Sequence, residues 1–338
     1  MSQVYRLLDL IADGNFHSGE ELGKTLGITR SAIWKIVKQL IARGLDIYCV
    51  RGRGYRLSDP VELLDQEKIL SVLDEGTRAK LNKLEVLTEV KSTNQYLMER
   101  VSKGLASGTA CLAEHQTASY GRRGRTWLSS VGHNVYLSMS WHFSTGAAGL
   151  SGLSLAVGIA VARVLKLSGL PDVAVKWPND LLCQDKKIAG ILLEVVGDAA
   201  GPCDVVIGVG LNVMNPRDER FAQIDQPWTD MAGVLGSKRP SRNRLAAAMM
   251  AELINVLGDF EQNGLENLMS EWQQVDALRG SDVQINVGNE QIEGIVKGID
   301  EQGSLLVEQD GQVKAFRGGE VSVKRFKREQ AIDNAYSV

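Results

Sequence analysis

The segment from Gly121 to Trp127, which reads Gly-Arg-Arg-Gly-Arg-Thr-Trp, places three guanidinium groups among glycines in a chain of net charge -3. Glycine lets the backbone approach a ligand closely, and arginine donates paired, charge-assisted hydrogen bonds to phosphate or carboxylate oxygens. The indole of Trp127 offers a flat face to a planar ring. Taken alone, the segment is equally compatible with a solvated basic turn, so the neighbouring motifs decide between the two interpretations.

Two later segments carry further groups of this kind. Lys176 to Asp180 reads Lys-Trp-Pro-Asn-Asp and follows an alternating apolar run, which is typical of a strand that enters a polar turn. Lys187 precedes the apolar run from Ile188 to Leu193, which resembles a buried strand. Lysine gives a point charge to a phosphate, and aspartate gives a hard oxygen to magnesium. We therefore expect the Lys187 ammonium to lie beside the Asn179-Asp180 turn, although each motif alone is common on protein surfaces.

Together with Ser92-Thr93-Asn94, these segments follow the order and spacing of the biotin protein ligases, and nearly all of the chain resembles the bifunctional bacterial members that also repress transcription. The resemblance implies an ATP-dependent ligase that activates biotin as biotinyl-5'-AMP, with Mg²⁺. It then transfers biotin to a lysine of the biotin carboxyl carrier protein of acetyl-CoA carboxylase. The adenylate-bound homodimer is expected to bind operator DNA and repress the biotin biosynthetic operon.

The resemblance also implies a role for individual residues. Catalysis is expected to rest on positioning and charge stabilisation, because neither step needs a nucleophile from the enzyme. The expected catalytic residues are Lys187, Arg122, Arg123 and Asp180, and Asp180 is also the expected magnesium ligand. Expected to bind biotin are Ser92, Thr93, Asn94, Gln116, Tyr120, Gly121, Arg122, Lys187 and Gly190. Expected to bind the nucleotide are Arg122, Arg123, Arg125, Trp127, Asn179, Lys187 and Asn212.

Simpler interpretations and two departures accompany these roles. Ser92 to Asn94 alone would be read as a helix cap, and Asn212 as a tightly packed strand end. Tyr120 stands where relatives extend the arginine-rich loop, so its backbone amide can bind biotin but its side chain adds no charge. Lys324 stands where relatives can carry arginine, and a bidentate contact would be lost there.

Composition agrees with a soluble, cytoplasmic protein of several domains. Hydrophobic residues make up 44% and charged residues 23% of the 338 positions, which is ordinary for globular proteins. The sequence predicts neither a signal peptide nor a membrane span. Four cysteines and four histidines occur at no metal-binding spacing, so we expect no structural zinc.

The charge is unevenly distributed along the chain. Residues 1–57 carry nine Lys or Arg against five Asp or Glu, a net charge of +4, and the remainder carries 29 (38 minus 9) against 36 (41 minus 5), or -7. A basic head on an acidic body indicates that the head meets nucleic acid.

The head also has the pattern of a winged helix-turn-helix over residues 1–60. A capping box at Ser18 and a glycine at Gly27 bound one helix, and Thr29 caps a second whose apolar stripe runs from Ile33 to Ile41. Residues 47–50 and 55–57 are expected to form a hairpin wing. A helical module that binds protein is the alternative. The residues expected to contact DNA are Arg30, Ser31, Trp34, Lys35, Lys38, Arg51 and Arg53.

Beyond a linker near residues 58–66, the sequence predicts two further domains. Strand and helix patterns alternate over residues 67–274, which indicates an α+β domain with a mixed sheet covered by helices, as the resemblance to the class II synthetase and biotin ligase fold also implies. Short β runs with turns such as Asp310-Gly311 predict a small SH3-like β-barrel over residues 275–328. Two other functions stay open: a lipoate-type adenylating ligase, and a biotin-responsive repressor without ligase activity.

Overall fold

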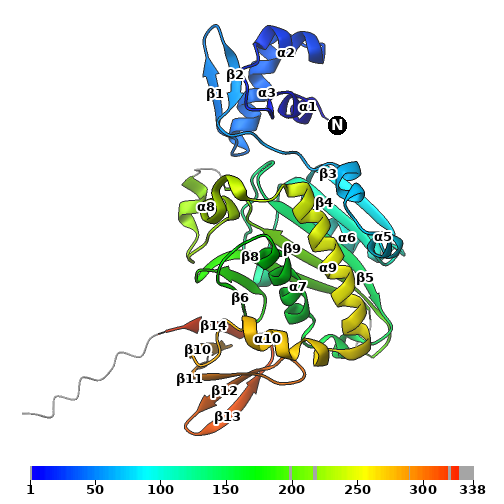
Figure 1. Cartoon of the computed structure of the whole chain (residues 1–338), viewed down its shortest axis with the longest axis vertical. Helices are drawn as coiled ribbons and strands as arrows, with labels where there is room; N and C mark the ends of the chain where they lie inside the picture. The colour runs from blue at the N-terminus through cyan, green and yellow to red at the C-terminus, as the bar shows by residue number, and fades with distance from the viewer. Residues whose placement is uncertain (1, 198–199, 216–218, 289, 319–320, 327–338) are drawn as a thin grey trace, which may run out of the picture.

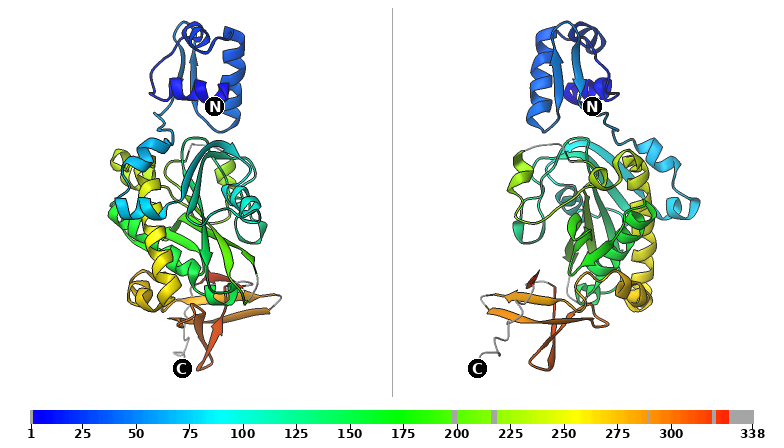
Figure 2. Two further views of the ribbon diagram at one scale, coloured as in Figure 1. Left: turned by 90° about the vertical axis from the view of Figure 1, so that its right-hand side faces the viewer. Right: turned by 60° about the vertical axis from the view of Figure 1, so that its left-hand side comes forward.

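The structure is a computed structural model that describes residues 2–197, 200–215, 219–288, 290–318 and 321–326. Figure 1 shows a small N-terminal head at one end of the long axis, a central body, and a C-terminal β unit at the other end. The two further views show the same order of the three units (Figure 2).

The head is a winged helix-turn-helix, as the sequence predicts. Its local signals work as expected: the Ser18 hydroxyl accepts a hydrogen bond from the Glu21 amide at 3.1 Å, the Thr29 hydroxyl accepts one from the Ala32 amide at 3.2 Å, and Gly27 is left-handed with φ 68°. The elements are α1 (Gln3–Ile11), α2 (Gly19–Leu26), α3 (Arg30–Ala42), β1 (Ile47–Val50) and β2 (Gly54–Leu57).

One residue of the predicted apolar stripe lies outside it. Ile33 is buried at the start of α3, whereas the side chain of Ile41 is 38% exposed. A helix turns by about 100° per residue, so Ile41 lies roughly 80° around the axis from Ile33. Leu40, in the same last turn, is fully buried. The prediction for Ile41 was therefore wrong because Ile41 lies past the edge of the buried stripe.

The body contains the predicted mixed sheet. Its seven strands lie in the order β3-β4-β5-β9-β8-β7-β6, with β3 parallel to β4 and every other pair antiparallel. The strands are β3 (Lys83–Val90), β4 (Thr109–Gln116), β5 (Val135–Phe143), β6 (Val173–Lys176), β7 (Asp180–Cys183), β8 (Lys186–Gly197) and β9 (Cys203–Leu211).

Helices cover both faces of this sheet. Leu112 and Ile207 pack in the main core with α7 and α9, whereas Cys111 and Val206 face the opposite side, with α6. The segment 147–167 is long and apolar enough to cross a membrane by length and composition, but 67% of its most apolar 18 residues are buried within the protein, and α7 lies in this core. The helices are α4 (Gln66–Ser71), α5 (Glu75–Lys80), α6 (Thr93–Val101), α7 (Leu153–Leu167), α8 (Met231–Leu235), α9 (Arg242–Asn263) and α10 (Met269–Val275).

The C-terminal unit, predicted as a small SH3-like β-barrel, is a small domain of five antiparallel strands among the described residues. The pairing order is β13-β12-β11-β10-β14, with β13 and β14 at the two edges. Its core is continuous with that of the body, and the Trp177 indole donates to the carbonyl of Gly303 at 3.0 Å. The predicted domain boundaries stay a prediction, and residues 327 and 328 lie outside the described residues. The strands are β10 (Asp282–Val287), β11 (Glu290–Ile299), β12 (Leu305–Gln309), β13 (Gln312–Phe316) and β14 (Val321–Arg325).

The segment expected to be a linker is held at both ends. Val61 packs into the core of the head, and Leu64 packs into the core of the body. Arg242, which is buried, donates to the carbonyl of Glu62 at 2.7 Å and to the carboxylate of Glu114 at 2.9 Å. Since its backbone is anchored to the body, the segment restrains the head instead of acting as a free tether.

Candidate functional site

The lysine and aspartate expected to meet do so. Asp180 is the first residue of β7, and its carboxylate oxygen lies 2.6 Å from Nζ of Lys187 in β8. The sequence predicted a turn at Asp180, because a four-residue strand directly after Pro-Asn gives no periodic signal. Lys176 lies opposite Asp180 in the pairing of β6 with β7.

Lys176 was not among the residues assigned from the sequence. Burial lowers its pKa; Asp180 opposes that shift and Lys187 adds to it. The signal was available, because Lys176 opens the same Lys-Trp-Pro-Asn-Asp motif. Lysines 176 and 187 therefore flank one carboxylate, and the site carries more positive than negative charge.

Arg122 turns from the arginine-rich loop toward this group. Its guanidinium donates to the side-chain oxygen of Asn179 at 3.0 Å and contacts the carbonyl of Gly318 in the C-terminal unit. Burial lowers the pKa of Arg122. Arg123, at φ 58°, and Arg125 are exposed, so only the first of the three loop arginines joins this partly buried group.

Trp127 lies against two glycines that are paired across β8 and β9. A Cβ at Gly190 would lie 2.9 Å from the indole, and one at Gly210 would lie 2.8 Å from it. Nζ of Lys187 is 5.4 Å from the ring centroid. Only glycine leaves room here for a flat ring against the sheet. Gly190 was expected at the site and Gly210 was not, although its Gly-Val-Gly-Leu context indicated close packing.

A buried chain of polar groups lies at the N-terminal end of α6. The side-chain oxygen of Gln116 accepts from the amide of Thr93 at 2.8 Å and from its hydroxyl at 3.1 Å. The hydroxyl of Ser138 lies 2.7 Å from that of Thr93 and 2.6 Å from the side-chain oxygen of Asn94. The Ser92 hydroxyl accepts from the Gln95 amide at 3.4 Å, so its geometry is that of the helix cap.

The chain of contacts continues to a carboxylate that sequence reasoning missed. The amide of Asn94 donates to Glu194 at 2.8 Å, and the phenol of Tyr120 donates to the same carboxylate at 3.0 Å. Burial, reinforced by Glu194, raises the pKa of Tyr120 to about 12, so its phenol stays protonated. Tyr120 thus has a polar partner within the site, although it brings no charge.

Asn212 follows β9 and binds backbone. Its side-chain amide donates to the carbonyl of Thr229 at 3.2 Å, and the backbone amide of Lys187 donates to the carbonyl of Pro227 at 2.9 Å. These contacts hold residues 227–229 against the strand that carries Lys187. Within the part of the chain that the structure describes, no group of three or more His, Cys, Asp or Glu could hold a metal ion.

The residues expected to contact DNA are all exposed on the head. All five on α3 are exposed; Trp34 is 51% exposed, with Nζ of Lys38 5.5 Å from its ring. In the wing, the guanidinium of Arg53 lies 4.2 Å from the ring of Phe16, and that of Arg56 lies 5.2 Å from it. Sequence reasoning missed Phe16 and Arg56, because their meeting depends on the tertiary fold.

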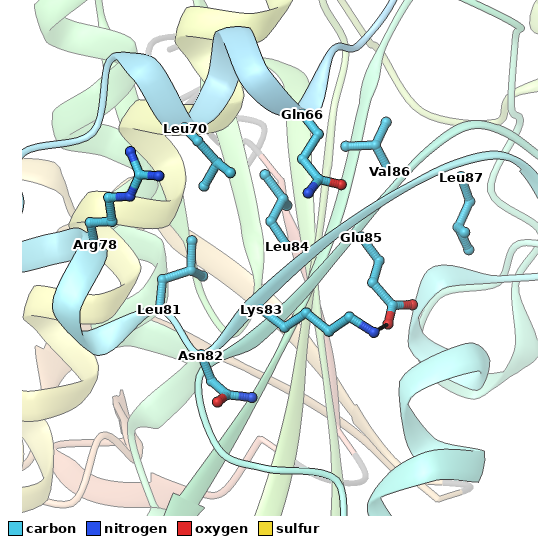
Figure 3. A pocket seen from close by; sticks show the side chains of 10 residues that line it. All are labelled: Gln66, Leu70, Arg78, Leu81, Asn82, Lys83, Leu84, Glu85, Val86 and Leu87. Atoms are coloured by element: carbon cyan, nitrogen blue, oxygen red, sulfur yellow. Dashed lines mark ion pairs between the residues drawn. The ribbon is translucent and has the colours of Figure 1, made fainter.

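A separate cavity of about 560 Å³ lies at β3, the edge strand of the sheet. Its wall is formed by α4, by Arg78 of α5, by the two residues after α5 and by residues 83–87 of β3, as Figure 3 shows. No residue expected to bind biotin or nucleotide lines it, so it is distinct from the site described above.

Comparison with known families matches all three units. The model of the Biotin/lipoate A/B protein ligase family matches residues 86–212, an HTH domain matches residues 3–56, and the Biotin protein ligase C terminal domain matches residues 280–324.

Individual relatives match over most of their length. The bifunctional ligase/repressor BirA of Escherichia coli is 45% identical over 94% of this chain and 96% of its own. The biotin–[acetyl-CoA-carboxylase] ligase of Mycobacterium tuberculosis is 33% identical over 77% of this chain and 98% of its own. The structure of the Aquifex aeolicus biotin protein ligase in complex with biotin and ATP has a TM-score of 0.62 at 27% identity, over 72% of this chain and all of that one.

Proposed function

Since the chain belongs to the biotin protein ligase family, we propose that it is a cytoplasmic ligase that uses ATP to attach biotin to a lysine of a biotin carboxyl carrier protein, and that it also represses transcription. The observation that carries the ligase function is the group formed by Lys187, Asp180, Arg122 and Trp127. It combines fixed positive charge with a flat aromatic surface, which suits an acyl adenylate.

In the first step the carboxylate of biotin attacks the α-phosphate of ATP. A bond forms between carboxylate oxygen and phosphorus, and pyrophosphate leaves. Lys187 stabilises the negative charge that gathers on the phosphate, and Arg122 holds the mixed anhydride through its guanidinium. In the second step the amine of the carrier lysine attacks the acyl carbon, AMP leaves, and an amide forms.

The polar groups at the start of α6 suit the ureido ring of biotin. Thr93, Gln116 and Asn94 supply donors and acceptors that are already oriented by Ser138 and Glu194. Gly190 and Gly210 leave room for the apolar part of the ligand or for Trp127. Because the polar groups of this site come from α6, β4, β5 and β8, the fold fixes their spacing before biotin binds.

Magnesium would be held by Asp180 together with phosphate oxygens, since Mg²⁺ commonly takes one or two protein carboxylates and completes its shell with phosphates and water. The single carboxylate beside Lys187 fits that pattern. When bound, the ion would neutralise charge on the leaving pyrophosphate. Lys187 and Lys176 supply the chain's own positive charge at the same place.

For the repressor function, we propose that DNA binds the basic face of α3 and the wing, and that two chains dimerise through β8. Among the described residues, β7 pairs with β8 only as far as Gly190, so residues 192–197 have a strand partner on one side alone. Glu194 of the biotin-site network lies on this open edge. We propose that the adenylate-bound chain dimerises through this edge and presents two heads to a two-fold operator, and that the carrier protein docks on the same surface.

A biotin-dependent ATP/pyrophosphate exchange assay, repeated with lipoate, tests this function against both alternatives. We expect exchange with biotin and little with lipoate. Preferential exchange with lipoate would favour a lipoate-type ligase, and no exchange with either acid would favour a repressor without ligase activity.

A further inference from the structure

Glu89, near the end of β3, is a point at which the head meets the body. Its carboxylate oxygen Oε2 lies 3.0 Å from Nε of Arg43 and 3.4 Å from the phenol of Tyr5, both in the head. The same oxygen lies 3.2 Å from Nδ1 of His115 on β4. One carboxylate therefore receives groups from two helical segments of the head and one strand of the body.

We propose that Glu89 is a positioning residue for the DNA-binding head, which it holds through Arg43 and Tyr5. Arg43 is the C-cap of α3, the helix assigned to the major groove, and Tyr5 is in α1. Two attachment points on different elements restrain rotation of the head, which one contact would not. The proposal rests on the proposed function only for its consequence, because the positioning itself can be measured without DNA or biotin.

The charges and protonation states suit this contact. Burial acts to raise the pKa of Glu89, but hydrogen bonds from Arg43 and His115 outweigh it and hold that pKa below its usual value. Burial, reinforced by Glu89, raises the pKa of the Tyr5 phenol. At neutral pH an ionised carboxylate therefore faces a charged guanidinium and a protonated phenol.

The contact lies beside the proposed ligand site. His115 precedes Gln116, whose side chain binds Thr93 in the biotin-site network. A second contact joins the head to the body. Val131, which is four residues after Trp127, packs with Val61 into the core of the head. The position of the head is thus fixed against the two segments, β4 and residues 127–131, that carry proposed ligand contacts.

The expected size of the effect is modest, because the side chains of Arg43 and Glu89 are 28% and 34% exposed. A partly exposed ion pair shifts a two-state equilibrium by up to about fivefold. Loss of the pair should leave the head attached through Val61 and Val131 but distributed over more orientations.

The test is a distance distribution between two spin labels in the full-length chain. Cys49 is exposed on β1 of the head, whereas Cys111, Cys183 and Cys203 are buried, so one label goes to the native head cysteine. The second goes to an exposed position of α7, introduced by Lys166→Cys. Glu89→Gln and Arg43→Met should each move population from a narrow distance peak into a broader one, by up to about fivefold, and the double variant should add little.

Glu85→Gln is the matched control. Glu85 lies on the same strand and binds Lys83, Tyr96 and Arg100, all within the body; Figure 3 shows its pairing with Lys83. This variant should keep the narrow peak, and pyrophosphate exchange should stay near the parental rate in both glutamate variants. A Glu89→Gln distribution as narrow as that of the parent, or equal broadening in Glu85→Gln, would overturn the proposal; neither result depends on ligase or repressor activity.

Discussion

Removal of the Lys187 ammonium should slow formation of the adenylate far more than removal of the neighbouring ammonium of Lys186. Nζ of Lys187 lies 2.6 Å from Asp180, and the side chain is mostly shielded from solvent, so its charge is fixed before the substrates arrive. Loss of one preorganised donor of this kind costs about 2.7–4 kcal/mol in the transition state, or roughly 100- to 1,000-fold in rate. We therefore expect Lys187→Ala to reduce biotin-dependent ATP/pyrophosphate exchange by about two orders of magnitude or more.

Lys186→Ala provides the control for this experiment. Lys186 is the preceding residue of β8 and is exposed. Because it is also a lysine, its replacement by alanine changes the net charge by the same amount. Exchange in Lys186→Ala should stay within about twofold of the parent, since exposed charges contribute little. Thermal unfolding of both variants separates a folding defect from a catalytic one. Near-normal exchange in Lys187→Ala, or equal losses in both variants, would refute the role assigned to Lys187.

Three further predictions concern the arginine-rich loop, the buried His133 and the DNA-binding head. Arg122→Gly should release the adenylate into solution, so that a labelled-biotin assay detects modification of bystander lysines; adenylate affinity equal to that of the parent, with only the carrier labelled, would contradict this. Burial lowers the pKa of His133 to about 4, so the folded state holds it neutral. Because the unfolded chain binds this proton more readily, the free energy of unfolding is highest above about pH 6.5. It falls as pH falls, by about 2 kcal/mol at pH 5. His133→Asn should remove this part of the pH dependence of thermal unfolding, and an unchanged pH profile would count against it. Lys35→Ala and Arg53→Ala should each weaken DNA binding and reduce the slope of log affinity against log salt by roughly one unit, measured by titration at several salt concentrations; unchanged slopes would exclude phosphate contacts at these residues.

The features predicted correctly from the sequence were those with local causes. Ser18, Gly27 and Thr29 bound their helices through contacts within four residues, the apolar run from Ile188 to Leu193 forms part of β8, and the longer apolar run from Leu153 to Leu167 forms α7. Lys187 and Asp180 were expected together because only a few residues separate the Asn179-Asp180 turn from the strand that Lys187 precedes. In each case the deciding contact lies close in sequence.

The features missed depend on contacts between distant segments. Glu194 binds Tyr120 and Asn94 across 74 and 100 positions, and nothing in its own surroundings indicates this. The wing arginine Arg56 meets Phe16 within the folded head, and Glu89 meets Arg43 across the contact between body and head. The strand β7 was missed for a different reason, because four residues beside a proline give too little pattern.

We propose a coupling of biotin activation to DNA binding within one chain. It is tested most directly by titrating the full-length protein onto DNA from the control region of the biotin biosynthetic genes, with and without biotin and ATP. We expect binding to tighten when both substrates are present, with neither substrate sufficient alone, and Lys187→Ala to regain tight binding only when preformed biotinyl-5'-AMP is supplied. Equal affinity with and without the two substrates would contradict the coupling.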